Sequence, residues 1–93
     1  MSQRSFHYEH PEHGWLRIMA GWDPPLQYHF LTIGDPGNML YSNLADPQGP
    51  GVPLERIAQI LEQHNIPMPA QLLSDLELDR KHNLGTFSHF YEN

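Results

Sequence analysis

The sequence predicts an α+β domain in which an antiparallel sheet of three to four strands is packed against two C-terminal helices. The main observation is a change of hydrophobic periodicity, because residues 15–44 alternate as strands do and residues 53–83 repeat as helices do. Between them, residues 45–52 contain two Gly and two Pro, which predicts a connecting loop. A length of 93 residues indicates one domain, with residues 1–44 as its sheet half.

Two short strands are predicted before residue 21. Both carry apolar side chains at alternate positions, Phe6 and Tyr8 in residues 5–9 and Leu16 and Ile18 in residues 15–20. Residues 10–14 have the composition of a turn. We expect the second strand to stop at residues 21–25, because Pro24 and Pro25 have no N–H to donate to a neighbouring strand.

The clearest strand is residues 26–33, which is rich in aromatic and β-branched side chains. Residues 34–38 follow with strong turn chemistry, and residues 39–44 would return antiparallel as the second arm of a hairpin. This hairpin is the most specific tertiary contact that the sequence predicts.

Two amphipathic helices are predicted in residues 53–83. Pro53 suits the first turn of a helix, where a missing N–H is tolerated. The apolar stripes that would pack on the sheet are Leu54, Ile57, Ile60 and Leu61 in the first helix and Leu72, Leu73 and Leu76 in the second. Residues 65–69 separate the helices, and Asn83 or Gly85 is expected to end the second one.

The last ten residues, 84–93, form an aromatic tail that contains Phe87, Phe90 and Tyr91. Three aromatic side chains near a terminus need cover from water. The tail is therefore expected to dock on the body, to pair as an edge strand, or to be held by a second subunit, and the sequence leaves these three arrangements open.

Composition excludes several classes of function. Five basic residues against eleven acidic ones give a net charge of −6, and only Arg80 and Lys81 are adjacent, so direct binding of nucleic acid is not expected. Apolar runs are too short to span a membrane, and no hydrophobic signal segment follows the first residues. The chain has no cysteine, which fits a reducing compartment. We expect a cytoplasmic protein.

The candidate metal ligands are His7, His10 and His13, which are spaced three residues apart. Neutral imidazole binds zinc, nickel or copper well, so a metal-binding or metal-sensing protein is one alternative for the function. The predicted strand and turn weaken it, because His7 and His10 would then lie on opposite sides of the strand. Weak, adventitious binding of zinc or nickel is the simpler interpretation, and no physiological cofactor is expected.

His29 is the candidate general base for a second alternative, a small enzyme with a pocket around this residue. It lies in the middle of an apolar strand, but the sequence supplies no nucleophile with a partner. A histidine in that position is more often a hydrogen-bonded packing residue, so no catalytic residue is predicted.

The leading hypothesis is a protein-interaction domain of the accessory or inhibitor kind, acidic and without catalytic activity. A rigid aromatic side chain beside prolines can anchor a protein interface with little loss of entropy. The interface candidates are Trp22, Pro24, Pro25, Phe87, Phe90 and Tyr91. A thin core also gains from dimerisation, so we expect a homodimer or a protein partner that the sequence does not identify.

Overall fold

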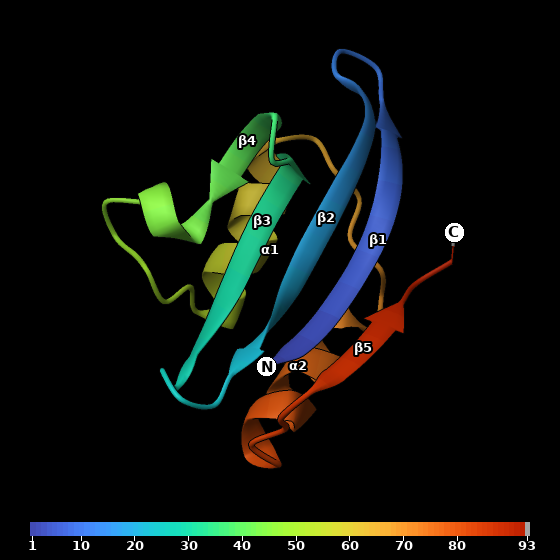
Figure 1. The fold of residues 1–93 in the computed structure, drawn as a ribbon. Helices are drawn as coiled ribbons and strands as arrows, with labels where there is room; N and C mark the ends of the chain where they lie inside the picture. The colour runs from blue at the N-terminus through green and yellow to red at the C-terminus, as the bar shows by residue number, and fades with distance from the viewer. Residues whose placement is uncertain (93) are drawn as a thin grey trace.

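The computed structural model describes residues 1–92 and confirms the predicted α+β class. One mixed sheet has the strand order β4-β3-β2-β1-β5, and two helices follow the first four strands along the chain (Figure 1). The strands are β1 (Ser2–His10), β2 (Gly14–Asp23), β3 (Tyr28–Asp35), β4 (Asn38–Ser42) and β5 (Phe87–Phe90). The helices are α1 (Leu54–Gln63) and α2 (Leu72–Lys81), with one short 3-10 turn, η1 (Asn43–Ala45), after β4.

Strands β1 to β4 form an antiparallel meander, and the predicted hairpin of β3 and β4 is confirmed. The register of the central strands places side chains with a similar degree of burial on the same face of the sheet. Cross-strand neighbours such as Phe6 and Ile18, or Ala20 and Leu31, are buried, whereas the intervening pair Met19 and Thr32 is only half-buried. The sheet therefore has one buried face, called here the inner face, and one outer face.

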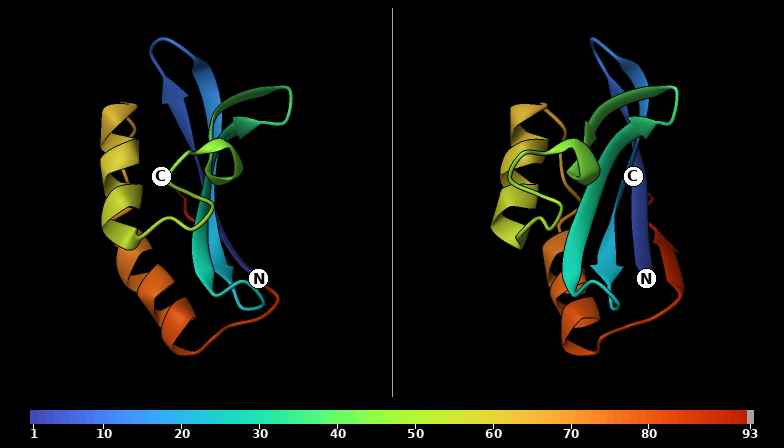
Figure 2. Two further views of the ribbon diagram at one scale, coloured as in Figure 1. Left: turned by 90° about the vertical axis from the view of Figure 1, so that its left-hand side faces the viewer. Right: turned by 60° about the vertical axis from the view of Figure 1, so that its left-hand side comes forward.

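Both helices lie on the inner face, as the edge-on view of the sheet shows (Figure 2). The predicted stripes contact the sheet, since Ile57, Ile60 and Leu61 of α1 and Leu72 and Leu76 of α2 are buried in one cluster with the strand residues. Pro53 precedes the first residue of α1, as predicted from its missing N–H. No helix in the described part of the chain is long and apolar enough to cross a membrane.

The second strand is longer than its sequence suggests. β2 runs to Asp23, and Trp22 pairs with His29 of β3 within the sheet. The prediction that residues 21–25 interrupt the strand was wrong at its first three positions, because Pro24 and Pro25 lie in the turn that follows the last ladder pair. The following strand accordingly begins at Tyr28 and not at residue 26.

The aromatic tail adds a fifth strand, which exceeds the three to four predicted. β5 pairs parallel to β1, with Ser5 opposite Phe90, and occupies one edge of the sheet. The backbone N–H of Tyr91 donates to the Ser5 carbonyl at 2.8 Å. Of the three arrangements open to the tail, an edge strand is the one found.

A buried polar cluster fixes the tail and α2 to β1. The Arg4 guanidinium donates two hydrogen bonds to Asp79, with Nε to Oδ2 at 2.8 Å and Nη2 to Oδ1 at 2.9 Å. Tyr91 accepts from Arg4 at 3.3 Å and donates to Asp75 at 2.6 Å. The hydrogen bonds to Asp79 raise the pKa of Arg4. Among residues 1–92, no buried side-chain nitrogen or oxygen lacks a hydrogen-bond partner.

Candidate functional site

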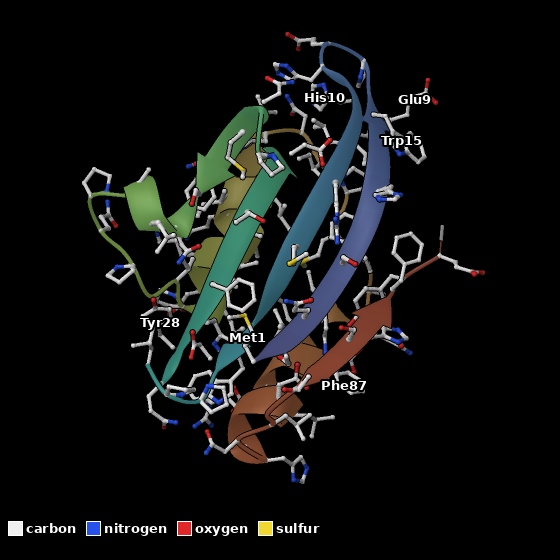
Figure 3. The ribbon with its side chains drawn as sticks, viewed as in Figure 1. Met1, Glu9, His10, Trp15, Tyr28 and Phe87 are labelled. Carbon is white, nitrogen blue, oxygen red and sulfur yellow. The ribbon has the colours of Figure 1, made fainter. Side chains whose placement is uncertain are left out.

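The outer face of the sheet is covered by neither helix (Figure 2). Its side chains come from alternate positions of the strands, and Glu9 and Trp15 are cross-strand neighbours near the tip of the β1–β2 hairpin (Figure 3). The Trp15 side chain is 63% exposed, although tryptophan is among the residues that gain most from burial. A tryptophan in this position is the first sign of a contact surface.

Three aromatic rings form a row across the edge of this face, called here the aromatic row. His7 of β1 lies between Trp15 of β2 and Phe90 of β5, with ring centroids 5.4 Å and 5.0 Å away. The Phe90 side chain is 47% exposed. Because β5 is at one end of the sheet order and β2 is two strands away, the row crosses three strands.

The remainder of the outer face is mostly uncharged. At its centre the half-buried Met19 of β2 lies beside the half-buried Thr32 of β3, and the half-buried Phe30 of β3 lies beside the buried Gly21 of β2. The charged positions in the paired β1–β3 register are Glu9, Arg17 and Asp23. The face therefore combines apolar area with little net charge, which is the composition of the buried centre of protein interfaces.

Gly21 shapes this face. A Cβ at this position would lie 2.6 Å from Cζ of Phe30 and would also overlap the Ser2 carbonyl oxygen. The absence of a side chain at Gly21 therefore leaves the space that the Phe30 ring occupies beside β2.

The three candidate metal ligands do not converge. His7 belongs to the aromatic row, whereas His10 is buried and binds the backbone through both ring nitrogens, with Nε2 2.8 Å from the His64 carbonyl oxygen and Nδ1 accepting from the Glu12 N–H at 3.0 Å. The His13 ring lies 4.8 Å from that of His10. Within residues 1–92 no group of three His, Cys, Asp or Glu side chains is arranged to hold a metal ion.

His29 of β3 is buried and hydrogen-bonded to the backbone of α2. Its Nε2 lies 2.9 Å from the Leu76 carbonyl oxygen, its ring contacts Trp22, and burial lowers its pKa. The shallow hollow beside it has a volume of about 490 Å³ and is bordered by Tyr28 and Arg80. The ring is therefore held within the chain by one hydrogen bond and one aromatic contact.

The sequence-predicted interface residues are divided between core and surface. Trp22 is 5% exposed and donates its Nε1–H to Asn83 at 2.9 Å, and Tyr91 is also buried. Pro25 is exposed and Pro24 is half-buried. Both lie in the turn after β2, at the opposite end of this strand from the hairpin tip. Phe87 and Phe90 are exposed on β5. The structure therefore does not bring the six predicted interface residues together in one surface.

A second polar cluster borders a groove between β4 and α1. Asp46 accepts hydrogen bonds from the Tyr41 hydroxyl and from Arg56, both at 2.7 Å. These bonds lower the pKa of Asp46 to about 2, and burial raises the pKa of Tyr41 to about 12. The groove has a volume of about 480 Å³ and includes Ile60 and His64. The Asp46 carboxylate has its hydrogen-bond partners within the chain. We therefore interpret the cluster as the contact that links the end of η1 to α1.

Trp15 is the surface residue that sequence reasoning missed, and His7 was considered only as a metal ligand. The signal was present, because Leu16 and Ile18 share one face of the predicted strand and Trp15 must then lie on the other. What the sequence did not contain was the position of β5, without which Phe90 has no reason to lie near His7.

Comparisons with known proteins give no significant match for this chain, whether with protein-family models, with curated proteins or with solved structures.

Proposed function

We propose that the protein is an interaction domain that binds a protein partner through the outer face of its sheet. The observation that carries the proposal is the exposure of Trp15 in a row with His7 and Phe90 on a face that no helix covers. Clusters of exposed aromatic residues on an otherwise well-packed domain are typical of protein-binding surfaces.

Charge supports a protein partner over a nucleic acid. Arg17 is the one basic residue in the paired β1–β3 positions of this face, and Arg4, Arg56 and Arg80 are engaged with carboxylates elsewhere. Stacking of bases on aromatic side chains is normally combined with a basic groove that follows the phosphates. A partner with an apolar patch fits the outer face better, and the acidic residues elsewhere keep the domain soluble.

Packing also favours this face over the set predicted from sequence. Trp22 and Tyr91 are buried within the chain itself, so a partner could reach them only after local unfolding. Trp15 and Phe90 are already exposed, so a partner could contact them without any rearrangement of the fold. The proposed contact surface is therefore centred on the aromatic row and not on the turn that contains Pro24 and Pro25.

The test compares three tagged proteins in extracts of cells that express the chain: wild type, Trp15→Ser and Leu78→Ser. Leu78 is the matched control, because it is an apolar residue 48% exposed on α2, which lies on the opposite side of the sheet. We expect a partner that wild type and Leu78→Ser retain and that Trp15→Ser loses at least tenfold. Equal retention by all three proteins would reject the outer face as the binding surface.

A further inference from the structure

We propose that the free edge of β5 pairs antiparallel with β5 of a second copy of this chain, with His89 of both copies at the two-fold axis. The inference goes beyond the proposed function, because it extends the outer face across two molecules. It begins from the position of β5 as the last strand of the sheet, with nothing beyond it among residues 1–92 (Figure 1).

The direction of the backbone groups of β5 follows from its pairing with β1. Tyr91 donates its N–H to the Ser5 carbonyl, and Ser5 is opposite Phe90 in a parallel register. In a parallel ladder of this kind, the two residues that flank Phe90 form the hydrogen bonds to the neighbouring strand. These residues are His89 and Tyr91. The N–H and C=O groups of Ser88 and Phe90 therefore point away from β1, toward the free edge.

Two copies can satisfy these groups reciprocally. If His89 lies opposite His89 of the second copy, Ser88 of each chain lies opposite Phe90 of the other. Residues opposite each other with inward-facing groups exchange two hydrogen bonds in an antiparallel pair. The edge is then self-complementary, which is the requirement for a closed two-fold dimer.

The edge of β5 lacks most of the features that keep sheet edges apart. Natural edges are protected by charged residues, proline, bulges or covering loops. Residues 86–91 contain no charged residue and no proline. A chain of net charge −6 would repel its copy, but this stretch brings no carboxylate to the seam, and charges elsewhere are screened over about 8 Å at physiological salt.

The opposite edge of the sheet is protected. The pairing of β4 with β3 is interrupted by a bulge between Ile33 and Gly34, and β4 ends at the η1 turn. Beyond that point the chain itself covers β3, since the Val52 N–H donates to the His29 carbonyl at 2.9 Å. The contrast between the two edges selects β5 as the site of pairing.

The proposed register also joins the two aromatic rows. Phe90 lies on the outer face beside His7. In the dimer the two Phe90 side chains are diagonal neighbours across the seam, at a separation of about 7–8 Å that aromatic rings can bridge. The two rows would then form one continuous strip from Trp15 of one copy to Trp15 of the other. Because β5 has four residues, the pairing is at the small end of specific interfaces, and we expect it to depend on concentration.

The first test is the molecular mass by light scattering over a range of concentrations. We expect the wild type to approach twice 10.8 kDa and Ser88→Pro to stay near 10.8 kDa. Proline at 88 removes a donor from the free edge only, so β5 keeps its bonds to β1. A wild type that stays at the monomer mass at millimolar concentration, or a Ser88→Pro protein that dimerises equally, would overturn the proposal.

The second test uses the absence of cysteine in this chain. In the proposed register the two residues at 89 form a non-hydrogen-bonded pair with Cα atoms about 4.5 Å apart, a separation that a disulfide can span. We expect His89→Cys to give a covalent dimer under oxidised glutathione and Ser88→Cys to give at least tenfold less. Cross-linking through position 88 and not 89 would contradict the register.

The tests separate this inference from the proposed function. Trp15 is two strands away from the seam, so Trp15→Ser should keep the dimer mass of the wild type even where it loses a partner. A dimer with no dependence of partner binding on Trp15 would reject the outer face alone. A monomer whose partner binding does depend on Trp15 would reject the edge pairing alone.

Discussion

Arg4 and Asp79 are the residues on which the attachment of the tail depends. Asp79 is fully buried and accepts both its hydrogen bonds from Arg4, which also lies over the Phe87 ring at 5.0 Å. A buried ion pair adds little stability compared with apolar residues of the same size, but the loss of one partner leaves a buried charge uncompensated.

Asp79→Asn is therefore expected to lower the free energy of unfolding by about 3 kcal/mol, at the lower end of the range for such pairs because Asp75 remains 3.5 Å from the guanidinium. The double variant Arg4→Met with Asp79→Leu should recover most of the loss. Urea denaturation of the wild type, Asp79→Asn and the double variant measures these differences in the free energy of unfolding. A double variant as unstable as Asp79→Asn would show that packing, and not the unpaired charge, dominates.

The two tryptophans should respond oppositely to truncation. Trp22 is buried and hydrogen-bonded to Asn83, so Trp22→Ala should cost about 3–5 kcal/mol of stability. Trp15 is exposed on the outer face, so Trp15→Ala should change stability by less than about 1 kcal/mol. Thermal or urea unfolding checks both values. A large loss in Trp15→Ala would mean that the outer face serves the fold and not a contact.

His29 gives the fold a dependence on pH. Burial lowers its pKa in the folded protein, whereas the unfolded chain has a value of about 6.5. Below pH 6.5 the unfolded chain takes up a proton that the folded protein does not, so this residue's contribution to stability is complete above pH 6.5 and decreases as pH falls. His29→Gln should lose less stability than wild type between pH 7 and pH 5. An unchanged pH profile would assign the dependence to other groups.

At the scale of the elements, most of the fold is predictable from periodicity. The β3–β4 hairpin, the helix that follows Pro53 and the burial of Leu72 and Leu76 all come from local patterns of apolar side chains. The end of β2 was misjudged because a proline marks where a ladder bond is missing, and Asp23 immediately before the prolines still has its partner, Tyr28.

The sequence left the fifth strand as one of three possible arrangements of the tail, because its cause is not local. β5 pairs with β1, and Tyr91 at its end is hydrogen-bonded to Arg4, which is 87 positions away in sequence. For the same reason the aromatic row was predictable only in part. Alternation places Trp15 outside the core, but the contact of His7 with Phe90 requires the parallel pairing of β1 and β5.

The packing of β2 against β3 on the outer face depends on Gly21. In Gly21→Ala the new methyl group would overlap the Ser2 carbonyl and meet the Phe30 ring, so we expect a loss of about 1–3 kcal/mol. Gly37→Ala is the matched control, because a Cβ at Gly37 has no neighbour within 4 Å. Chemical denaturation of the two variants tests the contrast. Equal stability would mean that β1 and Phe30 shift to accommodate the methyl group.

At the scale of the whole molecule, the domain is a two-layer structure with unequal faces. One face of the sheet is closed by α1 and α2, and the other exposes an aromatic row whose cross-strand neighbours include Glu9 and Arg17. The central claim is that this second face is covered by protein in the cell.

Hydroxyl-radical footprinting tests that claim most directly, by comparing the oxidation of exposed side chains in the purified dilute protein with that in the protein recovered from its cellular complex. We expect Trp15 and Phe90 to be protected in the complex, whereas Leu78 on α2 and Leu44 in η1, both exposed in the free chain, stay equally reactive. Protection of Leu44 and Leu78 with unchanged oxidation of Trp15 and Phe90 would contradict the assignment of the outer face as the binding surface.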